Sequence, residues 1–303
     1  MNNILQTRPV LGVVLVISSM GMIGLIDNFI RLIAKEAGLW QFHLLRSLVV
    51  CSCLLVIARL MHWRLRPKNW RAVVLRSFAF SSAMVLYFGS AGIISVSQAA
   101  SGLFTGPVFV LLISASFLGV RIGIWRILAV AIGFGGVLLI LRPDRGALSI
   151  MSVLPLFAGL FYALSGIATR RWCGQESTMT LNMGAFLGLG LWGALGVVVF
   201  TLFPVPPEIA RALPFFTRGW VHPSGAFVLW MLVQAFGSMA ATALLTRGYL
   251  LADVSFASGA EYSFLIFVAL WGYVLWGSVP DPVSALGAGA IVLSGVIILV
   301  RSR

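Results

Sequence analysis

Two stretches of the chain share one pattern and decide its fold. Residues 118–142 read LGVRIGIWRILAVAIGFGGVLLILR, and residues 276–301 read WGSVPDPVSALGAGAIVLSGVIILVR. Each runs from a glycine-closed apolar segment through a short turn into a glycine-rich apolar segment that ends in aliphatic residues and an arginine. The simplest account of this recurrence is that one unit of five apolar segments occurs twice, in residues 1–145 and again in residues 146–303.

The composition places both copies in a lipid bilayer. Of the 303 residues, 60% are hydrophobic and only 10% are charged, and the mean hydropathy is +1.04. Soluble domains are roughly 45–50% apolar and 25% charged, whereas a membrane-spanning helix needs about 20 mostly apolar residues. We therefore predict an all-α polytopic membrane protein with ten transmembrane helices. These lie near residues 9–33, 38–61, 71–92, 95–118, 124–141, 150–169, 181–203, 224–247, 255–276 and 283–300.

The basic residues indicate the orientation, because Lys and Arg are retained in short cytoplasmic loops. With the N-terminus inside, fourteen Lys and Arg residues, Arg76 among them, fall on the cytoplasmic side and six on the other, while Arg46 lies within an apolar segment. We therefore predict a multi-pass protein of the inner (plasma) membrane with both termini cytoplasmic. The first apolar run, residues 10–26, exceeds the core of a signal peptide, so we expect a retained helix.

The odd number of segments in each copy has a topological consequence. The second copy must enter the membrane from the opposite side, which makes two inverted five-helix repeats. This arrangement is typical of secondary transporters, whose sites lie near the midplane beside interrupted helices. We expect such interruptions at residues 102–107, which contain Gly102, Gly106 and Pro107, and at residues 258–260, which read Ser-Gly-Ala.

Several short motifs give the chain a family resemblance through their order and spacing. They are TGPVFV at residues 105–110, LG at 118–119, TRGY at 246–249, AEY at 260–262, WGYVLWG at 271–277 and PDP at 280–282. With them the chain resembles the drug/metabolite transporter superfamily, specifically its ten-helix EamA-type members, over essentially its whole length. Members usually carry an acidic residue directly after the Leu-Gly or Trp-Gly motif. In this chain Val120 and Ser278 occupy those positions, so the role that the acidic residues have in relatives cannot be assigned to them.

The resemblance implies a secondary transporter that moves a small organic metabolite by alternating access. Amino acids, vitamins, nucleoside-like metabolites and amphiphilic drugs are the implied substrate classes, and the residues do not choose among them. No nucleotide-binding motif of the G-x-x-x-x-G-K-[ST] kind occurs. We therefore expect no cofactor, and either proton coupling or simple exchange as the driving force.

Two ionisable residues inside apolar segments are the leading site candidates, since such residues cost about 2.5–3.5 kcal/mol to insert and usually face a cavity or a partner. Arg46 could anchor a substrate carboxylate or phosphate through its planar guanidinium. Its alternative role is to snorkel outward or to hold backbone carbonyls. Glu261 could bind a cationic group or carry a proton, or it could make a structural hydrogen bond to Arg46, Tyr262 or a helix end.

Polar and aromatic neighbours complete the candidate substrate-binding set. They are Tyr262, Gln98, Gln234, Trp230, Tyr87 and Asn28, with Asp27 beside Asn28. Each could equally make an ordinary interhelical hydrogen bond or lie at the membrane interface. His43, three residues before Arg46, is expected to be structural.

Other functional classes are less well supported. An intramembrane enzyme needs a nucleophile with its base, paired acids or metal ligands at one depth, yet the three histidines are dispersed and H-E-x-x-H is absent. We therefore expect no catalytic and no metal-binding residues. A channel would show a polar stripe along a helix, and a non-transporting scaffold is the remaining alternative.

The net charge of +13 comes from scattered basic residues, which topology explains better than nucleic-acid binding. A basic cluster at residues 59–76 could bind anionic lipid, although topology alone accounts for it. The expected partners are a small-molecule substrate and the lipid bilayer, with no nucleic acid, and the chain could act as a monomer or a homodimer.

Overall fold

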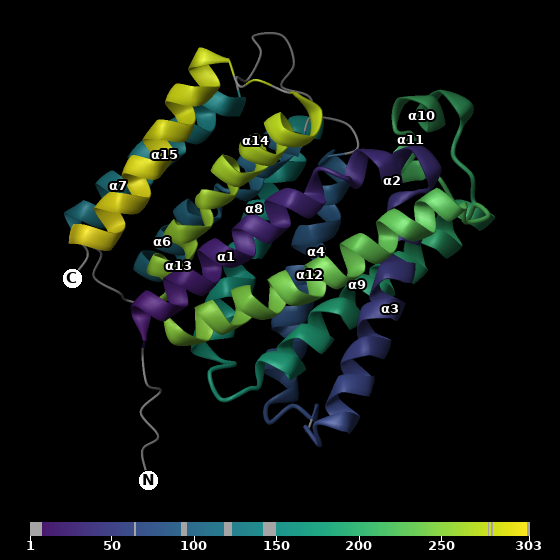
Figure 1. Ribbon diagram of the computed structural model, residues 1–303, viewed down its shortest axis with the longest axis horizontal. Coiled ribbons are helices and arrows are strands. Elements are labelled where there is room, and N and C mark those ends of the chain that lie inside the picture. The colour runs from purple at the N-terminus through teal and green to yellow at the C-terminus, as the bar shows by residue number, and fades with distance from the viewer. Residues whose placement is uncertain are drawn as a thin grey trace.

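The computed structural model describes residues 8–63, 65–91, 96–117, 123–141, 150–277, 279 and 281–301, which form fifteen helices and no β-strand (Figure 1). The helices are α1 (Pro9–Asp27), α2 (Ile30–Glu36), α3 (Leu39–Leu60), α4 (Trp70–Ala91), α5 (Val96–Leu103), α6 (Gly106–Ser116), α7 (Ile124–Leu141), α8 (Ile150–Arg171), α9 (Thr178–Leu202), α10 (Pro207–Ala212), α11 (Pro214–Thr217), α12 (Gly225–Leu251), α13 (Val254–Glu261), α14 (Ser263–Trp276) and α15 (Pro282–Arg301). The all-α prediction is confirmed for this part of the chain.

Helix occupies each of the ten segments that the sequence predicts, within the described residues. Six segments are long and apolar enough to cross a membrane by length and composition. They are Pro9–Glu36, Leu39–Leu60, Trp70–Ala91, Thr178–Leu202, Gly225–Leu251 and Phe256–Trp276. The full count of ten crossings and the inverted relation of the two halves stay predictions.

Three of the ten predicted segments consist of two consecutive helices. The break between α5 and α6 falls at Phe104 and Thr105, within the stretch where glycine and proline predict it. The break expected at residues 258–260 is displaced, because these small residues continue α13 and the helix ends at Glu261, before Tyr262. A further break, between α1 and α2 at residues 28–29, was not predicted.

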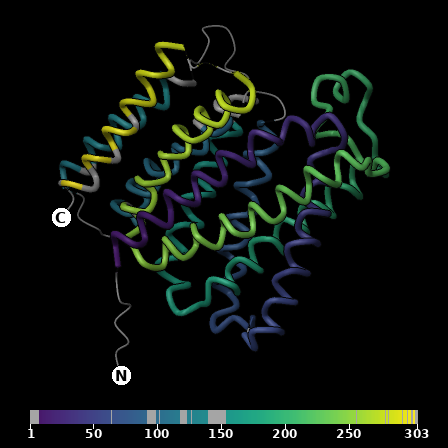
Figure 2. Tube along the Cα trace, viewed as in Figure 1, coloured from purple at the N-terminus to yellow at the C-terminus, as the bar shows by residue number. Residues whose placement is uncertain are grey.

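The two stretches with the shared pattern lie side by side. They contribute α7 and α15, which pack along each other at one edge of the bundle, as the tube in Figure 2 shows. The hydroxyl of Ser294 in α15 donates a hydrogen bond to the carbonyl of Ala129 in α7. The recurrence in sequence thus corresponds to one helix pair in space.

The rest of the bundle is built from three closely packed helix pairs, in which α1 lies on α12, α3 on α9 and α4 on α8 (Figure 1). Small residues permit close approaches between helices in membranes. A Cβ atom on Gly102 in α5 would overlap Pro155 of α8. A Cβ atom on Gly24 in α1 would lie 2.9 Å from the Phe267 side chain of α14. These approaches bring helices from both halves of the sequence around one centre.

Candidate functional site

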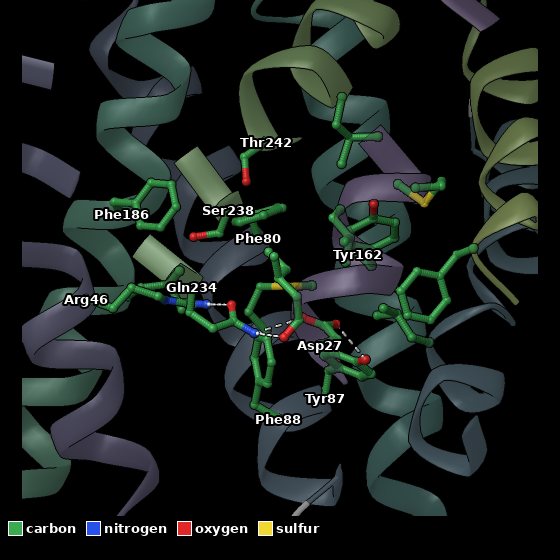
Figure 3. A pocket seen from close by; sticks show the side chains of 18 of the residues that line it. Asp27, Arg46, Phe80, Tyr87, Phe88, Tyr162, Phe186, Gln234, Ser238 and Thr242 are labelled. Atoms are coloured by element: carbon green, nitrogen blue, oxygen red, sulfur yellow. Dashed lines mark hydrogen bonds between the residues drawn. The ribbon is translucent and has the colours of Figure 1, made fainter. Parts of the chain in front are cut away.

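A cavity lies where helices from both halves of the sequence converge, between α1, α3, α4, α8, α9, α12 and α14. The space open to the centre of a water-sized sphere is about 60 Å³. Its walls are mostly apolar and aromatic, with phenylalanines contributed by α4, α9 and α14. Its polar side chains are those of Asp27, Arg46, Tyr87, Tyr162, Gln234, Ser238 and Thr242 (Figure 3).

Four of these side chains, one from each of four helices, form a hydrogen-bonded chain that we call the polar chain (Figure 3). Arg46 in α3 donates from Nη1 to Oε1 of Gln234 in α12 at 3.4 Å. Gln234 donates from Nε2 to Oδ1 of Asp27 in α1 at 3.3 Å. Tyr87 in α4 donates from its hydroxyl to Oδ2 of Asp27 at 2.9 Å. The chain thus joins a cation to an anion through one neutral amide.

The Arg46 guanidinium is deeply buried, with only 2% of the residue exposed. Its second polar contact is with Nδ1 of His43 at 3.0 Å, and its carbon Cζ lies 4.6 Å from the ring centre of Phe42 and 5.2 Å from that of Phe88. Its buried Nε donor has no hydrogen-bond partner within the described part of the chain. Among the described residues no carboxylate lies within 4.0 Å of the guanidinium. A buried cation is therefore held only by neutral groups and rings.

A second buried group, which we call the tyrosine cluster, consists of Arg76, Tyr162, Tyr249 and Glu261. Glu261 is the last residue of α13, and its Oε1 accepts a hydrogen bond from the Tyr162 hydroxyl at 2.9 Å, while the Tyr249 side chain lies near this carboxylate. Arg76 and both tyrosines line a small cavity of about 10 Å³. Tyr162 also lines the central cavity, so this side chain connects the two sites.

Arg76 in α4 connects three other helical segments through neutral oxygen atoms. It donates to the Thr169 hydroxyl at 3.1 Å, the Leu181 carbonyl at 2.8 Å and the Thr246 hydroxyl at 3.3 Å. The sequence counts Arg76 on the cytoplasmic side of the membrane, which stays a prediction, and the structure shows that this residue is buried between helices, with only 3% of it exposed. These three bonds replace the water that a loop arginine would contact.

Three of the predicted site residues come together at the central cavity. They are Arg46, Gln234 and Tyr87, and Asp27 joins them. Glu261 belongs to the tyrosine cluster, and no hydrogen bond joins it to Arg46 within the described residues. Arg46 and Glu261 thus belong to two separate groups.

The other predicted site residues whose side chains are described do not line the central cavity. Asn28 donates to the Gly24 carbonyl at 2.7 Å and so supports the end of α1. Trp230 stacks on Phe29 with ring centres 4.7 Å apart, and it does not line the central cavity. Tyr262 is buried beside the break after α13, and its hydroxyl has no hydrogen-bond partner among the residues that the structure describes. The side chain of Gln98 lies outside the described residues.

Sequence reasoning did not identify Arg76, Tyr162 and Tyr249 as site residues. A tyrosine within an apolar segment more often packs than binds, so only its partner could distinguish it. Arg76 could have been recognised as a candidate, because it lies six residues inside α4, well past the polar start of that helix. His43 was expected to be structural, and its contact with the Arg46 guanidinium places it beside the cavity.

Known proteins resemble this chain in sequence and in fold. The model of the EamA-like transporter family matches residues 10–142. A riboflavin transporter from Vibrio cholerae is 29% identical over 203 residues, which cover 66% of this chain and 61% of that protein. The pseudopaline exporter CntI from Pseudomonas aeruginosa is 26% identical over 73% of this chain and 71% of its own length.

A solved crystal structure shares the fold with a TM-score of 0.71 at 15% sequence identity, and the superposition covers 97% of both chains. This likeness concerns the fold alone. The family match covers α1 to α7, which contribute Asp27, Arg46 and Tyr87 of the polar chain. Residues 10–142 therefore resemble the EamA-like transporter family, and the predicted resemblance to the drug/metabolite transporter superfamily is confirmed.

Proposed function

We propose that this chain is a secondary transporter that carries a small organic metabolite across the bacterial inner membrane by alternating access. The observation that carries the proposal is the Arg46 guanidinium, which is buried beside the central cavity with an unpaired Nε and no carboxylate within 4.0 Å among the described residues. The relatives named as a riboflavin transporter and a pseudopaline exporter favour a transporter over an intramembrane enzyme.

Arg46 is suited to anchor an anionic group of the substrate. Its hydrogen bond to Gln234, at 3.4 Å, is longer than the usual 2.7–3.2 Å and is therefore easily exchanged. A carboxylate or phosphate could displace the Gln234 oxygen and accept two parallel bonds from the guanidinium. Asp27, at the other end of the polar chain, could accept a donor group of the same substrate.

The size of the central cavity indicates that the described conformation is closed. About 60 Å³ holds a few water molecules, whereas sites for organic ligands usually measure about 300–1,000 Å³. Loading therefore requires the surrounding helices to separate. The breaks at residues 28–29, 104–105 and 262 are the natural hinges, because the chain there can change direction without disrupting a continuous helix.

Glu261 is our candidate for proton coupling. Its carboxylate is buried and accepts a hydrogen bond from Tyr162, and no cation within 4.0 Å neutralises it among the described residues. A carboxyl group in such surroundings can exchange its proton when the protein opens. In Figure 1 the first turn of α1 and the last turn of α15 lie toward the same end of the bundle, which supports both termini on one side of the membrane. The excess of Lys and Arg on that side favours the cytoplasm.

Counterflow in proteoliposomes tests the proposal. Vesicles are loaded with pooled amino acids, nucleosides or riboflavin, and accumulation of the matching labelled compound is measured for the wild type, Arg46→Gln and the control Trp230→Phe, which changes an aromatic residue outside the cavity. We expect one class to accumulate with the wild type and the control and not with Arg46→Gln. If Arg46→Gln accumulated the compound as well as the wild type, Arg46 would not anchor the substrate. If folded and inserted protein accumulated no pool, the proposal that the chain is a transporter would be contradicted.

A further inference from the structure

A hollow unrelated to the central cavity opens on the outer surface between α4 and α9, and we call it the α4–α9 groove. Its volume is about 580 Å³. Val74 and Phe78 form the α4 wall, and Leu187, Leu191 and Leu195 form the α9 wall, all of them exposed and apolar. In a membrane-spanning protein, such a surface faces lipid chains.

Small residues form the floor of the groove and determine its shape. A Cβ atom on Gly184 would lie 2.5 Å from the Ser77 hydroxyl, and one on Gly188 would lie 2.8 Å from the Ser81 hydroxyl. The two helices therefore approach closely along the floor while the larger side chains stand out as walls. The small-xxx-small pattern of α9 is thus used within the chain and is not free to pair with a second copy.

The length of the groove suits one acyl chain. On α9 its lining runs from Thr180 to Leu195, which is about 22 Å at 1.5 Å per residue. One leaflet is about 15 Å deep, half of a hydrocarbon core of about 30 Å. A lipid chain can therefore lie in the groove along its whole leaflet.

Basic residues surround one end of the groove, where Pro67 lines it in the connection between α3 and α4. Arg66 and Lys68 flank Pro67, Arg71 lies in the first turn of α4, and all three are exposed. The Glu176 carboxylate lies nearby but accepts the backbone N–H groups of Lys68 at 3.1 Å and Asn69 at 2.7 Å. Within the described part of the chain no carboxylate lies within 4.0 Å of these three basic side chains, and Arg71 lies over the Trp70 ring at 5.6 Å, so their charges can meet another anion.

Exposed tryptophans mark the same end as an interfacial region. Trp63 and Trp70 are 53% and 63% exposed, and tryptophan is enriched at the level of lipid headgroups. We infer that the α4–α9 groove binds an anionic phospholipid, with one acyl chain between Val74 and Leu191 and the phosphate on Arg66, Lys68 and Arg71. The charge at this end complements the headgroup, and the apolar groove complements the chain.

Lipid retention measured by native mass spectrometry tests this inference. The whole protein is exchanged into nanodiscs with equal phosphatidylglycerol and phosphatidylcholine, and the lipids that remain bound after release are counted. The variants are the triple change Arg66→Gln, Lys68→Gln and Arg71→Gln, the groove-filling change Val74→Trp, and the matched control Arg211→Gln, which neutralises an exposed arginine of α10.

We expect the wild type and Arg211→Gln to retain phosphatidylglycerol over phosphatidylcholine, and the triple variant to reduce this preference at least about tenfold, since each basic residue near the surface contributes attraction for anionic lipid. Val74→Trp should reduce retention of both lipids. Equal retention of the two lipids by the wild type, or an unchanged preference in the triple variant, would overturn the inference. Disulfide-linked dimers of a Leu191→Cys variant would also overturn it, because a second copy would then occupy the groove.

Discussion

Neutralising Arg46 should destabilise the protein, and neutralising Asp27 as well should restore much of the loss. The change Arg46→Met removes the contact with His43 at 3.0 Å and the longer bond to Gln234 at 3.4 Å. It also leaves the Asp27 carboxylate buried without the cation that the polar chain connects to it. Adding Asp27→Asn removes the unbalanced charge and keeps the shape of the side chain.

The size of the effect follows from the shorter contact. A hydrogen bond to a charged group contributes about 1.5–3 kcal/mol, and the 3.4 Å bond is too long to add much. With an unfolding entropy of about 2.1 cal/mol/K per residue, a loss of 1 kcal/mol lowers the Tm of a chain of 303 residues by about 1.6 °C. Arg46→Met should therefore lower the apparent Tm by roughly 2–5 °C through the lost contact with His43. The unbalanced Asp27 charge should add a further decrease, which the double variant should recover, because contacting or linked residues are not additive.

Cys173 provides the assay. This residue is fully buried in the turn between α8 and α9, and burial raises the pKa of its thiol to about 11. A thiol-reactive dye should therefore label it only on unfolding, in a background where Cys51 and Cys53 are serine. Arg211→Met, at an exposed position, is the control and should leave Tm unchanged. Equal Tm values for Arg46→Met and its parent would refute the role of the guanidinium in the polar chain. Strictly additive effects would refute its coupling to Asp27.

Three further predictions concern other parts of the bundle. Glu261→Gln should abolish proton-coupled transport while leaving expression intact, because the amide cannot release a proton; pH-gradient-driven flux at the wild-type rate would contradict this. Gly102→Leu should lower the folded yield on size-exclusion chromatography, since its side chain would overlap Pro155, whereas Gly135→Leu, with open space around its Cβ, should not. Arg76→Gln should lower the apparent Tm by several degrees, because α4 loses bonds to three neighbours, and an unchanged melting curve would show that these bonds contribute nothing.

The sequence predicts the helical segments well because each is a local pattern of apolar residues between polar turns. The break at residues 104–105 was predictable for the same reason, since Gly102, Gly106 and Pro107 lie beside it. The break at residues 28–29 contains no such residue. It depends on how α1 ends against α14, where Asn28 also contacts the Val268 carbonyl at 3.4 Å, and no local pattern reports this contact.

The site was predictable only in part, because its contacts are long-range. Arg46 stood out as a charge in an apolar segment, yet its partner Gln234 lies 188 positions away along the chain. Tyr162 looked like any aromatic residue of a packed helix until the structure placed it against Glu261, 99 positions later. Residue type therefore indicated the candidates, and only the fold showed which of them meet.

The polar chain and the tyrosine cluster together have an electrical consequence. Their ionisable groups are two arginines, Arg46 and Arg76, and two carboxylates, Asp27 and Glu261, so their formal charges cancel. Moving one elementary charge through the membrane potential costs or yields about 2.3 kcal/mol per 100 mV. The unloaded site should therefore reorient at a rate that hardly depends on voltage. An anion bound at Arg46 would make the loaded step electrogenic, and the direction of net flux would then follow the potential.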